Sequence, residues 1–110
     1  MDLQVELNNR LRDLDVAIKS LRKTGEDYAK AYTDYRVELA KELMLLKNEG
    51  YAITLAGDIA RGKPQIAHLK FLEISKEAIY KANLESINAT KLAIKIIQEQ
   101  IEREWGTPNE

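Results

Sequence analysis

A glycine-rich stretch is the first feature whose residue types could do chemistry. The spacing of a phosphate-binding loop occurs in Gly57-Asp58-Ile59-Ala60-Arg61-Gly62-Lys63-Pro64, except that proline stands where Ser or Thr would coordinate magnesium. Proline also lacks the backbone N–H that such a loop offers to phosphate, and no strand pattern precedes the stretch. The sequence therefore favours a turn in which glycine ends a helix and Lys63 faces water.

Three tyrosines offer a second kind of chemistry, the binding of a planar ligand. Tyr28, Tyr32 and Tyr35 recur at helical spacing just after Gly25. Aromatic rings stack on nucleotide-like ligands, and a glycine leaves room beside them. Core packing is the commoner reason for such a series of tyrosines. In that case the rings pack in the core and each hydroxyl reaches its edge. We favour aromatic layers and keep the ligand site as the alternative.

Neither metal binding nor acid–base catalysis is indicated by the remaining polar residues. His68 is the only histidine and the chain has no cysteine, which excludes disulfides, thiolate ligands and a cysteine nucleophile. The carboxylates are spread along the chain and pair naturally with bases one turn away, as in Asp15 with Lys19, Glu26 with Lys30 and Glu77 with Lys81. We expect no enzymatic activity, no metal and no cofactor.

The charge balance argues against a nucleic acid or a membrane as the main partner. Seventeen basic residues against eighteen acidic ones leave a net charge of -1. Acidic residues interrupt both loose basic groups, which are Arg61, Lys63 and Lys70, and Arg10, Arg12, Lys19, Arg22 and Lys23. A replication or recombination accessory with weak DNA contact is therefore only a third hypothesis. No signal peptide or membrane span is indicated, so we expect a cytoplasmic protein.

The elements that position these residues are two long helices. Apolar residues separated by alternating steps of four and three predict a helix over about 3–48 with a coiled-coil seam, formed by Leu7, Leu11, Leu14, Ile18, Leu21, Gly25, Tyr28, Tyr32, Tyr35 and Leu39. Asp2 is a suitable N-cap and Gly50 a suitable left-handed end. The seam continues through Gly25, which predicts a close contact or kink within one continuous helix.

A structured connector should join the two helices over residues 50–63. It is expected to contain a short helix at about 55–61, capped by Thr54, with Ile53, Leu55 and Ile59 turned inward. Pro64 fits the first turn of a second helix over about 64–105, and 106–110 form a tail. The expected fold is one all-α domain, residues 1–110, built as a long antiparallel, coiled-coil-like helical hairpin.

The second helix carries apolar residues on two sides, and this predicts self-association. At about 100° per residue, one arc contains Ile66, Leu69, Tyr80, Leu84, Ile87, Ile94, Ile101 and Trp105. A second arc gives the expected oligomer interface, Phe71, Ile74, Ala78, Ala82, Ala89, Leu92, Ala93 and Ile96. One partner helix cannot cover both arcs. We expect a homo-oligomeric helix bundle, for which a dimer is the simplest case.

Several short patterns resemble a group of small helical proteins from temperate phages and prophages of Gram-positive bacteria. They are Ala29-x-Ala31, Tyr35-Arg36-Val37, Gly50-Tyr51-x-Ile53-Thr54, Asp58-Ile59-Ala60-Arg61-Gly62, Ala78-x-Tyr80 and Ile101-x-Arg103-Glu104-Trp105. The resemblance implies a viral accessory protein in the host cytoplasm and assigns no activity to individual residues.

Taken together, these patterns favour a non-enzymatic, self-associating protein that binds a macromolecular protein partner in an accessory, regulatory or inhibitory role. The connector is its expected recognition end, with Asp58, Arg61 and Lys63 as partner-binding residues. The alternative from a different class is an oligomer that binds or sequesters a nucleotide-like ligand at Tyr28, Tyr32 and Tyr35.

Overall fold

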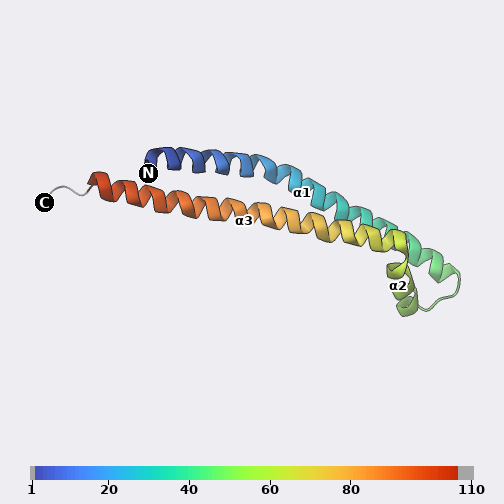
Figure 1. Ribbon diagram of the computed structural model, residues 1–110. Coiled ribbons are helices and arrows are strands. Elements are labelled where there is room, and N and C mark those ends of the chain that lie inside the picture. Colours follow the sequence, from blue (N-terminus) through green and yellow to red (C-terminus); the bar gives the residue numbers. More distant parts are fainter. Residues whose placement is uncertain (1, 107–110) are drawn as a thin grey trace. The chain divides into compact units, whose positions relative to one another are not determined.

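The computed structural model describes residues 2–106 and is all-α over that range (Figure 1). Its helices are α1 (Leu3–Asn48), α2 (Ile53–Gly62) and α3 (Pro64–Gly106), and no strand occurs among the described residues. The predicted fold class is therefore confirmed. Helix α3 includes Gly106, and the rest of the predicted tail lies outside the described residues.

The chain divides into two compact units that share the two long helices. The first comprises the described parts of Met1–Lys23 and Lys81–Glu110, and the second is Thr24–Tyr80, which also contains α2. Within each unit, a segment of α1 runs antiparallel to a segment of α3 (Figure 1). This is the hairpin arrangement that the seam spacing predicts.

Local signals explain both ends of α1. The side chain of Asp2 accepts a hydrogen bond from the Gln4 backbone N–H at 2.9 Å, as an N-cap does. At the other end, Gly50 has φ +96°. Its N–H donates to the Lys47 carbonyl at 3.0 Å, and the Tyr51 N–H donates to the Leu46 carbonyl at 3.2 Å. These two bonds are those of a Schellman motif, whose left-handed residue is usually glycine.

Gly25 lies inside α1 without interrupting the helix. A Cβ atom at this position would lie 3.3 Å from Cε1 of Tyr80, so the missing side chain leaves room for that tyrosine ring. The prediction of a close contact within a continuous helix is confirmed.

Contacts in the second unit follow one antiparallel register. Gly25 lies beside Tyr80, Tyr28 beside Glu77, and Tyr35 beneath Lys70. Each advance along α1 is matched by an equal retreat along α3. Because these contacts keep the same offset, the two helix segments of this unit have one defined alignment.

The predicted inward face of α2 was wrong for Ile53 and Leu55 and correct for Ile59, which packs against the core cluster. The helix begins at Ile53 with Ala52 as its N-cap, so Thr54 lies within the first turn and does not cap it. Ile53 is 74% exposed, Leu55 is 51% exposed and Ile59 is only partly buried, whereas the buried α2 residues are Ala56, Gly57 and Ala60. A short helix that packs at a tight corner needs small residues against its neighbours, and residue size misled the sequence-based assignment.

Helix α2 covers part of the α1 seam in the second unit. The main core cluster joins residues of all three helices: Tyr35, Leu39, Leu46, Ala56, Ala60 and Ile66. Where α2 is close, the seam positions Leu39 and Leu46 are buried; one heptad earlier, Tyr32 is 46% exposed. Tyr32, Leu39 and Leu46 lie one heptad apart on the same side of α1, and their burial therefore depends on whether α2 is near.

The first unit has its buried residues mainly on α3. Ile87, Ile94 and Ile97 are buried, and the Asn83 side-chain amide donates to the Ala17 carbonyl at 2.9 Å. On α1, Leu7, Leu14 and Leu21 are partly buried, while the seam residues Leu11 and Ile18 are exposed. Trp105, expected in the inward arc, is 85% exposed because α1 begins only at Leu3 and offers little helix to cover it.

Candidate interaction surfaces

In the second unit, α3 exposes large apolar side chains. Phe71 is 64% exposed and Ile74 is 55% exposed, and Ala78 is also exposed. Ile66, on the same helix, is almost completely buried. This part of α3 therefore packs one apolar side within the unit and leaves the other uncovered by the chain itself.

In the first unit, α3 shows the same division. Leu92 is 58% exposed and Ile96 is 48% exposed, whereas the neighbouring Ile94 and Ile97 are buried. The small residues of the predicted interface that belong to this unit are Ala82 and Ala89, which are exposed, and Ala93, which is partly buried. The interface assignment stays a prediction. The large residues of the predicted interface are exposed in the single chain, as this prediction requires.

The predicted partner-binding residues of the connector have two different environments. Asp58 and Arg61 are exposed on α2 and lie 3.8 Å apart, from Oδ1 to Nη1. The Arg61 guanidinium lies over Gly57, where a Cβ atom would come within 3.0 Å of Nη1. The Arg61 side chain therefore lies along α2 beside Gly57 and is 58% exposed.

Lys63 is engaged within the chain and does not simply face water, as the sequence suggested. Its Nζ donates to Oε2 of Glu42 at 2.6 Å, and the Glu42 side chain is only 16% exposed. This hydrogen bond raises the pKa of Lys63 above its ordinary value. Because Lys63 directly precedes α3, the pair ties the α2–α3 corner to α1. The structure therefore gives Lys63 an anchoring contact within the chain, and its partner-binding role stays a prediction.

An apolar hollow lies between the end of α1 and the start of α2. It has a volume of about 190 Å³ and is lined by Leu43, Met44, Lys47, Ile53 and Ala56. Met44 is 68% exposed, so the hollow has a large apolar residue at its edge. Sequence reasoning missed this feature because it assigned Ile53 to the core. The sequence feature that relates to the hollow is the presence of large apolar residues in the connector, such as Ile53.

Tyr28 packs within the helix pair of the second unit. Its hydroxyl donates to Oε2 of Glu77 at 2.7 Å, and its ring lies 6.0 Å from that of Tyr80, centre to centre. The hydrogen bond to Glu77 is the main cause that raises the pKa of Tyr28, and burial adds to it. The space beside Gly25 is therefore occupied by Tyr80, which the ligand hypothesis did not include.

The other two tyrosines differ from Tyr28 and from each other. Tyr32 is 46% exposed, whereas Tyr35 is buried in the main core cluster. The Lys70 ammonium lies 4.8 Å from the Tyr35 ring centre and 2.8 Å from Oε2 of the buried Glu73. Oε2 of Glu73 is buried, and its polar contact is this ion pair with Lys70. A ligand site shared by the three tyrosines stays a prediction.

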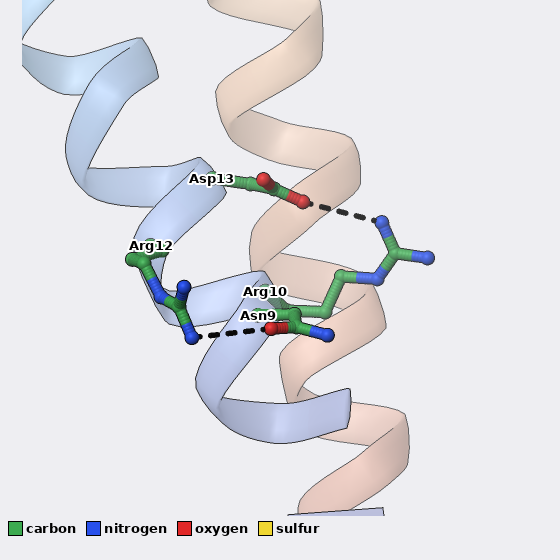
Figure 2. A network of polar contacts seen from close by, with 4 residues as sticks. All are labelled: Asn9, Arg10, Arg12 and Asp13. Atoms are coloured by element: carbon green, nitrogen blue, oxygen red, sulfur yellow. Dashed lines mark hydrogen bonds and ion pairs between the residues drawn. The ribbon is translucent and has the colours of Figure 1, made fainter. Parts of the chain in front are cut away.

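Basic residues near the start of α1 have polar partners on the same helix (Figure 2). Arg10 pairs with Asp13 at 3.4 Å, and Arg12 donates to the Asn9 side chain at 3.2 Å. Further along, Lys19 pairs with Asp15 at 2.8 Å, as the sequence predicts. This segment therefore presents alternating charges and hydrogen-bonded groups.

Residues 2–106 contain neither a cluster of metal-ligating side chains nor a helix suited to crossing a membrane. No group of three or more potential ligands from His, Asp and Glu lies together in this range, and His68 is exposed. Within the same range, none of the helices combines the length and apolar character that crossing a bilayer requires.

Comparison with protein-family models, curated proteins and solved structures finds no match to this chain.

Proposed function

We propose that this chain is a non-enzymatic, self-associating helical protein that presents a surface to a macromolecular protein partner. The observation that carries this proposal is the exposure of Phe71, Ile74, Leu92 and Ile96 on α3, a helix that already buries another apolar side. Large exposed apolar patches on soluble proteins generally mark interaction sites. The resemblance to phage accessory proteins is in keeping with a role of this kind.

Measurement of the mass in solution tests self-association. Sedimentation of the wild-type chain over a wide concentration range should give a species heavier than 12.6 kDa, the mass of one chain. Leu92→Glu combined with Ile96→Glu should shift the equilibrium towards the monomer, because burial of two carboxylates in an apolar interface is unfavourable. The matched control is Val5→Glu combined with Val16→Glu, which changes two exposed apolar residues of α1.

A wild-type chain that remains monomeric at every concentration would contradict self-association. Equal effects of the α3 and α1 variants would contradict the assignment of the interface to α3.

The partner surface is proposed to include Asp58 and Arg61 with the adjoining apolar hollow. Polar groups beside an apolar depression are typical of protein recognition sites. Replacement of Asp58 and Arg61 by alanine should weaken capture of the partner without a change in helicity or mass. The control is Asp15→Ala with Lys19→Ala, an exposed ion pair on α1. Equal capture by both variants would contradict this location.

A further inference from the structure

The outward residues of α3 repeat in mirror order about the middle of the helix. Read forward, they begin with Phe71, Ile74, Ala78 and Ala82. Read backward, they begin with Ile96, the neighbours Ala93 and Leu92, then Ala89 and Glu85. Both readings place large apolar residues first and alanine next, and they differ at the innermost position, where Ala82 corresponds to Glu85. All of these residues are exposed except Ala93, which is partly buried. A surface of this kind is complementary to a reversed copy of itself.

We propose that α3 packs antiparallel against α3 of a second copy of this chain, with a twofold axis at the level of Asn83 and Leu84. This inference rests on the proposed self-association and adds its orientation and its residue pairs. A twofold interface is reciprocal, so each contact occurs twice. Phe71 lies against the partner's Ile96, Ile74 against the partner's Leu92, and Ala78 against the partner's Ala89.

The sizes of these residues suit two helices that cross at their small positions. Ala78, Ala82 and Ala89 allow the helix axes to approach closely near the centre, towards the lower end of the usual separation of about 8–10 Å. Phe71 and Ile74 at one end, with Leu92 and Ile96 at the other, then fill the space as the helices diverge. Size alone would also permit a parallel pair, because each residue would then meet its own copy.

The residues that flank the stripe select the antiparallel orientation. On a projection at about 100° per residue, one flank carries charged residues, which are Lys70, Glu77, Lys81, Lys95 and Glu99. Glu85 lies on the stripe itself, on the side next to this flank. The other flank carries uncharged residues, among them Ser75, Ile79 and Ser86. Like flanks meet in an antiparallel pair, and unlike flanks meet in a parallel pair. Flanking charges commonly set the orientation of paired helices.

The centre of the interface shows the best charge match. With the axis at Asn83 and Leu84, Lys81 lies next to the partner's Glu85, and the symmetry creates the same pair a second time. Both residues are exposed in the single chain. A parallel pair would instead place the charged flank over the uncharged flank, where its residues gain no opposite charge.

Disulfide trapping tests the orientation, because the natural chain has no cysteine. Ala78→Cys and Ala89→Cys should each form little disulfide-linked dimer alone. A mixture of the two, with one carrying a mass tag, should form the mixed dimer severalfold faster under mild oxidation. Both alanines are exposed, so cysteine fits at either position without a change in the packing within the chain. Val16→Cys on α1 is the control for random collision, since it is also exposed.

The possible results separate this inference from the proposed function. Efficient dimers of each variant with itself would establish a parallel pair and overturn the inference, while self-association would stand. A dimer by mass with all crosslinking at the control level would overturn the assignment to α3. A monomer by mass, with control-level crosslinking, would overturn both the inference and the proposed self-association.

Discussion

At the scale of single residues, polar groups at the helix–helix contact of the second unit are paired across it. Tyr28 on α1 donates to Glu77 on α3, and Lys70 on α3 bridges the Tyr35 ring and the buried Glu73. Buried polar groups that lose a partner are costly, so alternative pairings of the two helices are disfavoured. These residues therefore specify alignment in addition to stability.

The hydroxyl of Tyr28 predicts a loss of stability at alkaline pH. Its hydrogen bond to Glu77 requires the protonated phenol and raises the pKa of the folded state above the ordinary 10.0. The folded protein therefore holds this proton to higher pH than the unfolded chain does. The contribution is complete below pH 10.0 and is lost as the pH rises through the folded-state pKa.

Tyr28→Phe should lower the urea midpoint at neutral pH and reduce its fall at alkaline pH. Lys63 and Lys70 have raised pKa values that act in the same direction, so the difference between wild type and variant isolates the tyrosine. Tyr32→Phe, at an exposed position, is the matched control. If the two variants have the same midpoints at every pH, the hydrogen bond contributes nothing to stability.

At the scale of the elements, the ends of the helices follow local chemistry and the packing of α2 does not. Asp2, Gly50 and Pro64 are capping or breaking residues whose roles depend only on their neighbours, so the sequence predicted the ends they define. The α2 face depends on how close three helices come, and the contact between Lys63 and Glu42 joins residues 21 apart in sequence. Such distant contacts leave no periodic signal.

The two glycines that end α1 and α2 should respond differently to substitution. Gly50 has φ +96°, a conformation that costs an alanine about 1–2 kcal/mol. Gly62 ends α2 with a negative φ, and a Cβ atom there would meet no other atom within 4 Å. Gly62→Ala should therefore be neutral or stabilise by up to about 1 kcal/mol.

Chemical denaturation of both glycine variants measures these effects, with circular dichroism as the probe of helicity. Equal stability of Gly50→Ala and wild type would show that the left-handed end of α1 does not constrain the fold.

At the scale of the whole molecule, the candidate sites were only partly foreseen. The separation of α3 residues into an inward and an outward set followed from helical periodicity, because the period of the helix is fixed. Leu92 and Ile96 are exposed, as the outward set requires. The hollow beside Met44 and the anchoring of Lys63 depend on the α2 corner, which periodicity cannot describe. The three tyrosines share a spacing but differ in burial, because α2 covers only part of the seam.

Self-association predicts that thermal stability depends on protein concentration. Folded chains that bind one another are stabilised by mass action, whereas unfolded chains are not. The unfolding midpoint of the wild type should rise with concentration, and that of Leu92→Glu with Ile96→Glu should stay constant. A scanning-calorimetry series measures both. A wild-type midpoint that is independent of concentration would indicate that folding and assembly are not coupled.

The common offset of the α1–α3 contacts in the second unit has a mechanical consequence. If α3 slid by one heptad, Tyr28 would face Lys70, the gap at Gly25 would face Glu73, and Tyr80 would lose the space that admits its ring. A load directed along the axes must therefore break several contacts together. A load that peels the helix segments apart breaks them one after another. This unit should consequently yield far more easily to peeling than to shear.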